Sequence, residues 1–230
     1  NEITAIPALV ERLAVNDGLK DAVVTIDAIA TNARVATAIR DAGAHYLLAV
    51  KDNQPTLRAE IESFFASAPA AALASVTDVD KGHGRIEQRT VTVACQVDWL
   101  NGDRRFPGEL RLPQIATLVG GAARADHKDG SPFETRYYIS SATLSAARDA
   151  EAVRSHWAIE NSLHWVLDVT FGEDQARLRK GHGAINMAVV RHFAINLVRA
   201  AVDKKSIKLR RKRAAWDAQY LANILGALSR

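Results

Sequence analysis

The sequence is poor in the residues that build covalent or metal-linked scaffolds. Cys95 is the single cysteine among 230 residues, which excludes an internal disulfide framework and a cysteine-rich zinc site. This composition fits a reducing compartment, so we expect a cytoplasmic protein. No apolar run is long enough to span a bilayer, and no membrane partner is expected. The chain shows neither a signal-peptide pattern nor an initiating methionine, which predicts that it begins part-way through a longer gene product.

The residues that are present favour a globular, mildly basic protein. Hydrophobic residues make up 48% of the chain, enough for a sizeable core, and the formal net charge is +4. The positive charge is concentrated in one short segment near the C-terminus, which is typical of either a solvated segment or a phosphate-contacting patch. The segment contains Lys204, Lys205, Lys208, Arg210, Arg211, Lys212 and Arg213.

The hydrophobic patterning predicts an α/β fold with three regions. Residues 1–66 contain two β-branched or apolar runs around a helical pattern, which predicts a parallel strand pair. Residues 67–142 alternate between polar and apolar side chains and have the character of a β-rich insertion. Residues 143–230 are helical in pattern, and the last predicted helix covers Ala214 to Leu228.

Polar residues follow both predicted strands of the first region. Asp27 ends the run from Ala22 to Ile26, and Lys51, Asn53 and Gln54 follow the run from His45 to Val50. Open α/β sheets place their chemistry at the carboxyl ends of such strands. Asp27 is alternatively the N-cap of the helix that follows it, since aspartate is a favoured cap.

The stretch from Arg154 to Asp174 concentrates ionisable and aromatic residues. If the stretch is a continuous helix, His156, Glu160, His164 and Asp168 are four residues apart and form one polar stripe, while Trp157 packs into the core. This pattern predicts the wall of a reaction centre. A half-exposed amphipathic helix with a merely solvated stripe is the alternative.

Taken together, these motifs resemble one protein family. The chain is similar to the DDE transposases of bacterial insertion sequences, specifically the H-repeat-associated group. The resemblance covers nearly the whole chain, and its longest segment is the most specific. The matching segments are Asn1–Pro7, Val24–Ala28, Lys51–Pro55, Gly82–Arg85, Tyr138–Ser141, His156–Asp168 and Phe171–Asp174.

The resemblance implies a ribonuclease H-like catalytic core with a β-rich insertion and C-terminal helices. Three carboxylates of that core hold two Mg²⁺ (or Mn²⁺) ions, which suit hard oxygen ligands. Asp27 matches the second of them and Glu160 the third. The first lies on an earlier strand, upstream of this sequence, and nothing here replaces it. The wider class has an arginine and a lysine where this chain has His156 and Leu167.

The resemblance also implies DNA partners, namely insertion-sequence terminal repeats and target DNA, bound by a homodimer. We expect His156 or His164 to contact phosphate or orient Glu160, with a packed or solvated histidine as the alternative. Asp168, Glu173 and Asp174 would support the site or are ordinary surface acids. The turn from Gly82 to Arg85 either approaches phosphate or simply connects a hairpin. The expected DNA contacts are Lys51, Asn53, Gln54, Arg85, Arg177, Arg179, Lys180, Lys208, Arg210, Arg211, Lys212 and Arg213.

Three functions remain open at this point. The first is a transposase catalytic domain that cleaves and transfers DNA strands with Mg²⁺. The second is an inactive remnant that binds DNA or a partner, because the first aspartate is missing. The third is a hydrolase whose His156, Glu160, His164 and Asp168 bind a transition metal such as zinc or iron.

Overall fold

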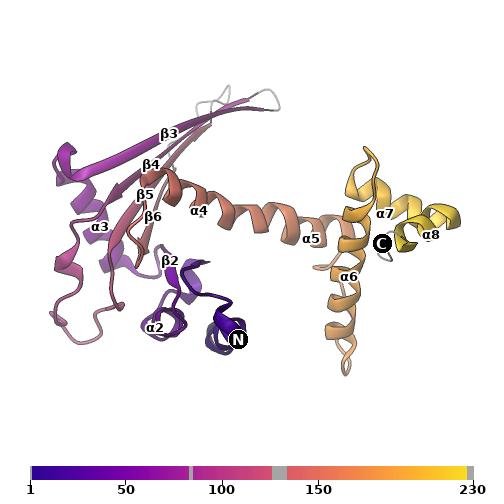
Figure 1. The fold of residues 1–230 in the computed structure, drawn as a ribbon, viewed down its shortest axis with the longest axis horizontal. Coiled ribbons are helices and arrows are strands. Elements are labelled where there is room, and N and C mark those ends of the chain that lie inside the picture. Colours follow the sequence, from indigo (N-terminus) through magenta and orange to yellow (C-terminus); the bar gives the residue numbers. More distant parts are fainter. Residues whose placement is uncertain (1, 83–84, 126–133, 227–230) are drawn as a thin grey trace. The chain divides into compact units, whose positions relative to one another are not determined.

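The computed structural model describes residues 2–82, 85–125 and 134–226, and it divides the chain into two compact units (Figure 1). The first unit runs from Asn1 to His156 and the second from Trp157 to Arg230. Among the described residues, no helix is both long and apolar enough to cross a membrane. The helices and strands that begin in the first unit are α1 (Glu2–Leu13), β1 (Val23–Ile26), α2 (Ala33–Asp41), β2 (His45–Val50), α3 (Pro55–Ser67), β3 (Leu73–Gly82), β4 (Arg85–Ala94), β5 (Thr117–Ala125), β6 (Glu134–Ser140) and α4 (Ala146–Ile159).

The six strands of the described residues form one mixed sheet in the order β1-β2-β6-β5-β4-β3. The pair β1 and β2 is parallel, with Val23 opposite His45, and every other neighbouring pair is antiparallel. The predicted parallel pair is therefore confirmed. The strands of the predicted β-rich insertion extend this same sheet, since β6 pairs directly with β2 through Leu47 and Ser140. The predicted division into residues 1–66, 67–142 and 143–230 stays a prediction.

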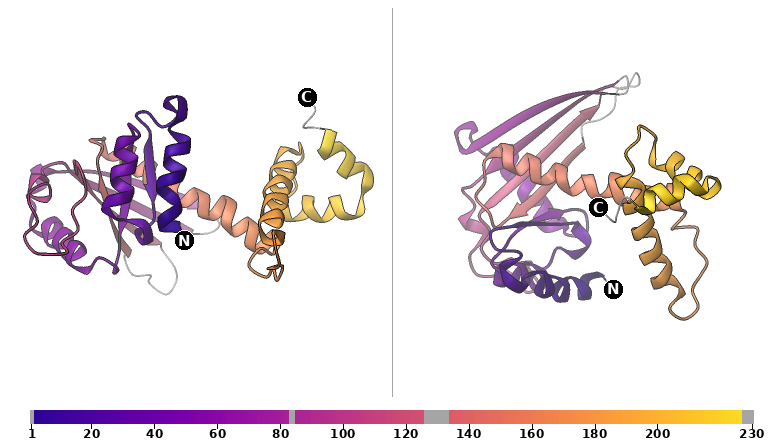
Figure 2. Two further views of the ribbon diagram at one scale, coloured as in Figure 1. Left: turned by 90° about the horizontal axis from the view of Figure 1, so that it is seen from below. Right: turned by 45° about the vertical axis from the view of Figure 1, so that its right-hand side comes forward.

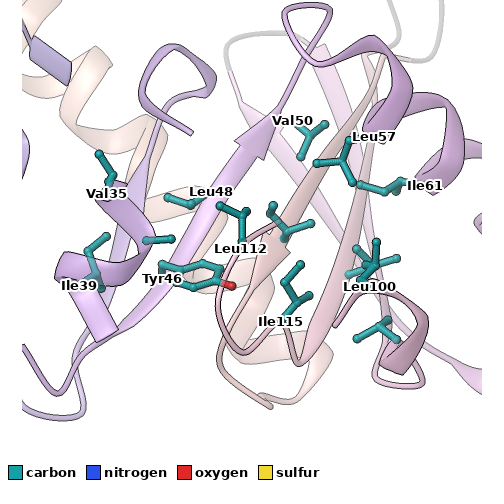
Figure 3. Packing of buried hydrophobic residues seen from close by; sticks show 14 of the residues in the cluster. Val35, Ile39, Tyr46, Leu48, Val50, Leu57, Ile61, Leu100, Leu112 and Ile115 are labelled. Atoms are coloured by element: carbon teal, nitrogen blue, oxygen red, sulfur yellow. The ribbon is translucent and has the colours of Figure 1, made fainter. Parts of the chain in front are cut away.

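Helices cover both faces of the sheet, which explains why β2, the strand next to the β1 edge, is buried from Tyr46 to Val50. Val35, Ile39 and Ile61 of α2 and α3 pack on one face against Tyr46 and Leu48 of β2 (Figure 3). On the other face, α4 packs against the alternate residues of the strands, and Figure 2 shows it crossing that face. A strand buried on both sides reads as a continuous hydrophobic run. The covering helices thus fix β2, and with it the edge where Asp27 and Lys51 follow their strands.

The second unit contains only helices among its described residues. Its helices are α5 (Trp165–Phe171), α6 (Gly183–Ala200), α7 (Ile207–Trp216) and α8 (Ala218–Gly226), and a five-residue π-helix (Glu160–His164) precedes α5. The helix predicted from Ala214 to Leu228 is wrong in its continuity. Asp217 has an extended backbone between α7 and α8, and its side chain accepts a hydrogen bond from the Tyr220 amide, which starts a new helix there.

Candidate active site

The carboxyl ends of β1 and β2 bring Asp27 and Lys51 into contact. The Lys51 ammonium donates to Asp27 Oδ1 at 2.7 Å, and the two side chains are 50% and 47% exposed. Asp27 precedes a short 3₁₀ turn (Ala28–Ala30), but its side chain makes no capping hydrogen bond there. The carboxylate therefore faces a cation at the sheet edge, and the simple N-cap interpretation does not account for it.

The surroundings of Asp27 keep its carboxylate ionised. Partial burial raises its pKa, but the Lys51 hydrogen bond, the Ala28 amide and the charges of Lys51 and His156 lower it, and the net pKa lies below the ordinary value. An aspartate with a lowered pKa is anionic at neutral pH. It can therefore hold a cation.

His156 reaches the same sheet edge from α4. Its Nδ1 lies 3.1 Å from Thr25 Oγ1, and Thr25 is two residues before Asp27 on β1, which places both on one face of the strand. His156 is half-buried, and it is one of the groups whose charge lowers the pKa of Asp27. The structure anchors His156 to β1, and its predicted contact with phosphate or with Glu160 stays a prediction.

The turn after β2 is held by the side-chain amides of two predicted DNA contacts. Asn53 Nδ2 donates to the Ala28 carbonyl at 2.9 Å, and Gln54 Nε2 donates to the Thr31 carbonyl at 2.7 Å. These bonds join the segment after β2 to the segment after β1. Asn53 and Gln54 therefore fix the relative position of Asp27 and Lys51, and their contact with DNA stays a prediction.

Glu160 begins the π-helix of the second unit. The Trp165 amide donates to the Glu160 carbonyl five residues earlier, which is the hydrogen bond of a π-turn. A π-turn, like an α-helical turn, still brings residues four positions apart to nearby directions, so the spacing of Glu160 and His164 is retained. The predicted continuous α-helix is interrupted at this point by the π-helix. Both side chains are exposed, and π-turns inside α-helices occur frequently at functional sites.

Three acids gather where α5 ends. Gly172 adopts a left-handed conformation (φ 65°, ψ 39°), and the Glu173 amide donates to the Leu167 carbonyl, so the chain turns back on the helix. Asp168 has a raised pKa because of partial burial and because Asp174 and Glu173 lie nearby. Glu173 also lies 3.7 Å from the Arg191 guanidinium of α6. The predicted supporting acids are thus brought together within the second unit.

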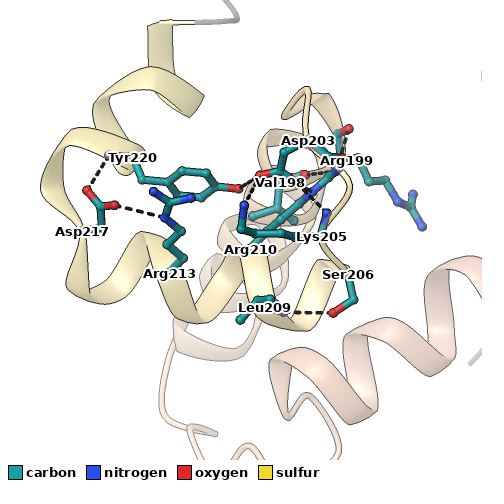
Figure 4. Close-up of polar contacts among 10 residues, drawn as sticks. All are labelled: Val198, Arg199, Asp203, Lys205, Ser206, Leu209, Arg210, Arg213, Asp217 and Tyr220. Atoms are coloured by element: carbon teal, nitrogen blue, oxygen red, sulfur yellow. Dashed lines mark hydrogen bonds and ion pairs between the residues drawn. The ribbon is translucent and has the colours of Figure 1, made fainter.

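The basic segment divides into two kinds of side chain (Figure 4). Arg210 donates to Asp203 Oδ1 at 2.8 Å and to the Val198 carbonyl at 2.8 Å, while Tyr220 donates to Asp203 Oδ2 at 2.7 Å. Arg213 pairs with Asp217 at 3.1 Å and lies over the Tyr220 ring. Arg210 and Arg213 therefore hold the helices together. Exposed basic residues of the predicted DNA set in this unit are Arg177, Arg179, Lys180, Lys208, Arg211 and Lys212.

The two predicted metal ligands lie in different units of the chain. Asp27 belongs to the first unit and Glu160 to the second, so their pairing around shared ions stays a prediction. Arg85 begins β4, whereas His83 and Gly84 lie outside the described residues. Within the described part of the chain, no three His, Cys, Asp or Glu side chains are grouped so that they could hold a metal ion. The four residues of the proposed hydrolase stripe thus do not form such a group.

Comparison with known proteins decides the family. Residues 1–197 match the model of the transposase DDE domain. The chain belongs to the DDE transposases. Their domains are ribonuclease H-like, which agrees with the mixed six-stranded sheet and the helices that follow it. The predicted family and fold class are confirmed.

The similarity to curated relatives indicates the group of DDE transposases that this chain resembles. The chain is 36% identical over 98% of its length to the "H repeat-associated putative transposase YhhI" of Escherichia coli K12, and 35% identical over its whole length to the "Putative transposase YncI" of E. coli O157:H7. It therefore resembles the H-repeat group of DDE transposases. The chain spans 59% and 58% of the length of these two relatives.

Some contacts of the site could not be predicted from the sequence. Thr25, which holds His156, is an ordinary β-branched strand residue, and Asp203 and Tyr220 are 17 positions apart. Only the fold brings such residues to their partners. The alternation of β1 could have suggested that Thr25 and Asp27 share a face, but not which helix residue meets them.

Proposed function

We propose that this DDE transposase chain provides two of the three catalytic carboxylates, Asp27 and Glu160, of a metal-dependent DNA cleavage and strand-transfer site. The observation that carries the proposal is the sheet edge at Asp27. There, one ionised carboxylate is flanked by the ammonium of Lys51 and by His156. Such an edge combines a ligand for a hard cation with an ammonium and an imidazole that can contact a phosphate.

The chemistry of the donors fits divalent ions. Asp27 is half-exposed and anionic, Glu160 is exposed, and both offer the oxygen ligands that Mg²⁺ and Mn²⁺ prefer. When bound, such ions supply activation of the attacking oxygen and stabilisation of the leaving oxygen at phosphorus. Asp27 and Glu160 would hold them together with the first aspartate of the complete site.

The two side chains beside Asp27 then have distinct tasks. Lys51 holds Asp27 through a hydrogen bond and keeps it ionised, and its charge is close enough to attract a phosphate to the same edge. His156 is fixed by Thr25, so its ring is held in one place on the strand face. A fixed ring can donate a hydrogen bond to a phosphate oxygen without a large loss of side-chain entropy.

The proposed partners are insertion-sequence ends and target DNA, bound in the cytoplasm by paired protomers. Exposed cations of both units supply phosphate contacts that carry no sequence information. These contacts include Arg177, Arg179 and Lys180 in the segment that precedes α6. Because each phosphate contact releases counterions, binding should weaken steeply as salt increases.

The test is cleavage and strand transfer on terminal-repeat DNA with a protein of the relatives' full length. Asp27→Asn and Glu160→Gln should each lower the rate more than about a hundredfold, which exceeds the loss typical of residues that only support a metal ligand. Glu151→Gln, an exposed carboxylate on α4, is the matched control and should retain the rate. Full activity of Glu160→Gln would overturn the assignment.

The second candidate function is that of an inactive remnant that binds DNA or a partner. DNA binding and cleavage assays test it. The family resemblance assigns Asp27 and Glu160 in this chain and leaves the first aspartate unassigned. If the chain binds DNA and neither it nor the full-length protein cleaves DNA with Mg²⁺ or Mn²⁺, the remnant interpretation is correct. If the full-length protein cleaves, the catalytic interpretation holds.

A further inference from the structure

Helix α7 carries an unusual density of positive charge. Its ten residues, Ile207–Trp216, contain five Lys or Arg side chains and no acid. Arg210 is neutralised by Asp203 and Arg213 by Asp217, both outside the helix. The other three cations are Lys208, Arg211 and Lys212, and all three are exposed.

The two sets of cations lie on different sides of α7. With 3.6 residues per turn, Lys208, Lys212 and Trp216 fall at successive four-residue steps within an arc of about 80°, and Arg210 lies roughly opposite Lys208. Arg211 flanks the first face, with its guanidinium 5.8 Å from the Phe171 ring centre. The Arg210 side is anchored to Val198 and Asp203, so the Lys208 side must point away from that anchor.

Trp216 is the distinctive member of this outer face. Its side chain is 67% exposed at the end of α7. Among the described residues, Lys208 and Lys212 make no ion pair, so their charges are free to meet a partner. An exposed indole in line with two free ammonium groups combines a stacking surface with a track of positive charge.

We propose that the Lys208–Lys212–Trp216 face of α7 binds a DNA strand with unstacked bases, with the lysines on consecutive phosphates and the indole against a base. Proteins that bind single strands combine these same two elements, a basic track and an aromatic platform. A protein partner would meet the two unpaired lysines of this face, flanked by Arg211, which favours a polyanion. The inference rests on the proposed function only for the choice of DNA as the nucleic acid.

The anchor opposite this face explains how a short helix could serve as a rigid platform. Asp203 accepts hydrogen bonds from Tyr220, Arg210 and the Lys205 amide, and these bonds hold its pKa well below the usual range. The Ser206 side chain caps the start of α7 through the Leu209 amide. Helix α7 is thus held at its first turn by Ser206, on its inner side by Arg210, and next to α8 by the Arg213–Asp217 pair.

The experiment measures binding of the 230-residue chain to fluorescent single-stranded and duplex oligonucleotides without divalent metal. Trp216→Leu keeps an apolar side chain but removes the aromatic ring, and it should weaken single-strand binding about tenfold or more. Trp216→Phe should stay within about threefold of the parent, since it keeps a stacking ring. The Lys208→Ala/Lys212→Ala variant should reduce the single-strand salt slope by about 1.4.

Lys20→Ala, which removes an exposed lysine of the first unit, is the matched control and should change neither affinity nor slope appreciably. The proposal is overturned if Trp216→Leu and the double lysine variant bind single strands as Lys20→Ala does. It is also overturned if Trp216→Leu changes the oligomeric state in light scattering and leaves DNA binding intact, because the face then binds protein. The assay contains no divalent metal and measures no cleavage, so its outcome is distinguishable from a failure of the proposed catalysis.

Discussion

Asp149 is a carboxylate inside an apolar layer. It is fully buried on α4, between Ala146 and Ala150, which both pack against the sheet. Neither carboxylate oxygen has a hydrogen-bond partner among the described residues. Burial raises its pKa from 3.8 to about 6, because ionisation in this layer is not compensated by any partner. The residue therefore costs stability whenever it is charged.

Replacement of Asp149 by asparagine should raise the free energy of unfolding at pH 8. A pKa shift of this size corresponds to about 3 kcal/mol, and relaxation around the charge should leave a gain of roughly 1–3 kcal/mol. The native aspartate binds its proton more tightly than the unfolded one. Parent stability should therefore fall as pH rises from about 4 to 6, and the variant should not show this fall. Urea unfolding at several pH values measures both effects.

Glu151→Gln on the exposed side of α4 is the control for this prediction. Its ion pair with Arg148 is exposed, so its loss should change stability by less than about 0.5 kcal/mol. Equal stability of Asp149→Asn and the parent at pH 8 would contradict the burial argument, since a compensated carboxylate would gain nothing from neutralisation.

At the scale of elements, sequence patterning predicts the regular parts and misses the interruptions. The parallel pair and the position of Asp27 and Lys51 follow from two apolar runs around a helical pattern, because a strand–helix–strand unit pairs its strands in parallel. The π-turn at Glu160 could not be predicted, since the stretch contains no glycine or proline and every residue tolerates a helix. The anchoring of Arg210 and Arg213 depends on acids that only the folded chain brings near.

The turn that ends α5 yields a prediction for an element. Gly172 has φ +65°, and an added Cβ would meet no atom within 4 Å, so substitution costs backbone strain alone. Gly172→Ala should lower the local stability of α5 by about 1–2 kcal/mol, and Gly172→Asn should cost less. Hydrogen exchange of the α5 amides should then accelerate roughly 5- to 30-fold in the alanine variant.

Gly102→Ala is the matched control, because its Cβ would also meet nothing and its φ is not positive. It should leave the exchange of α5 unchanged. If the α5 amides exchange as slowly in the Gly172→Ala variant as in the parent, the left-handed turn is not what terminates the helix. The positions of Glu173 and Asp174 would then need another explanation.

At the scale of the molecule, the catalytic proposal joins two units. Asp27 lies in Asn1–His156 and Glu160 in Trp157–Arg230, and 132 residues separate them in the chain. Each carboxylate has its own local support: Asp27 has Lys51 and His156, and Glu160 has the π-turn. A shared ion would therefore couple two units that otherwise contribute to the site independently.

This coupling predicts strong non-additivity in metal binding. In a protein of the relatives' full length, Asp27→Asn and Glu160→Gln should each weaken Mn²⁺ binding, and the double variant should bind little worse than the weaker single one. Ligands of the same ion behave in this way, because removal of one already loses most of the site. Electron paramagnetic resonance titration of free Mn²⁺ measures the affinities. For the control pair, Asp27→Asn and Glu151→Gln, the changes in the free energy of Mn²⁺ binding should add. If the changes caused by Asp27→Asn and Glu160→Gln also add, the two carboxylates belong to separate sites.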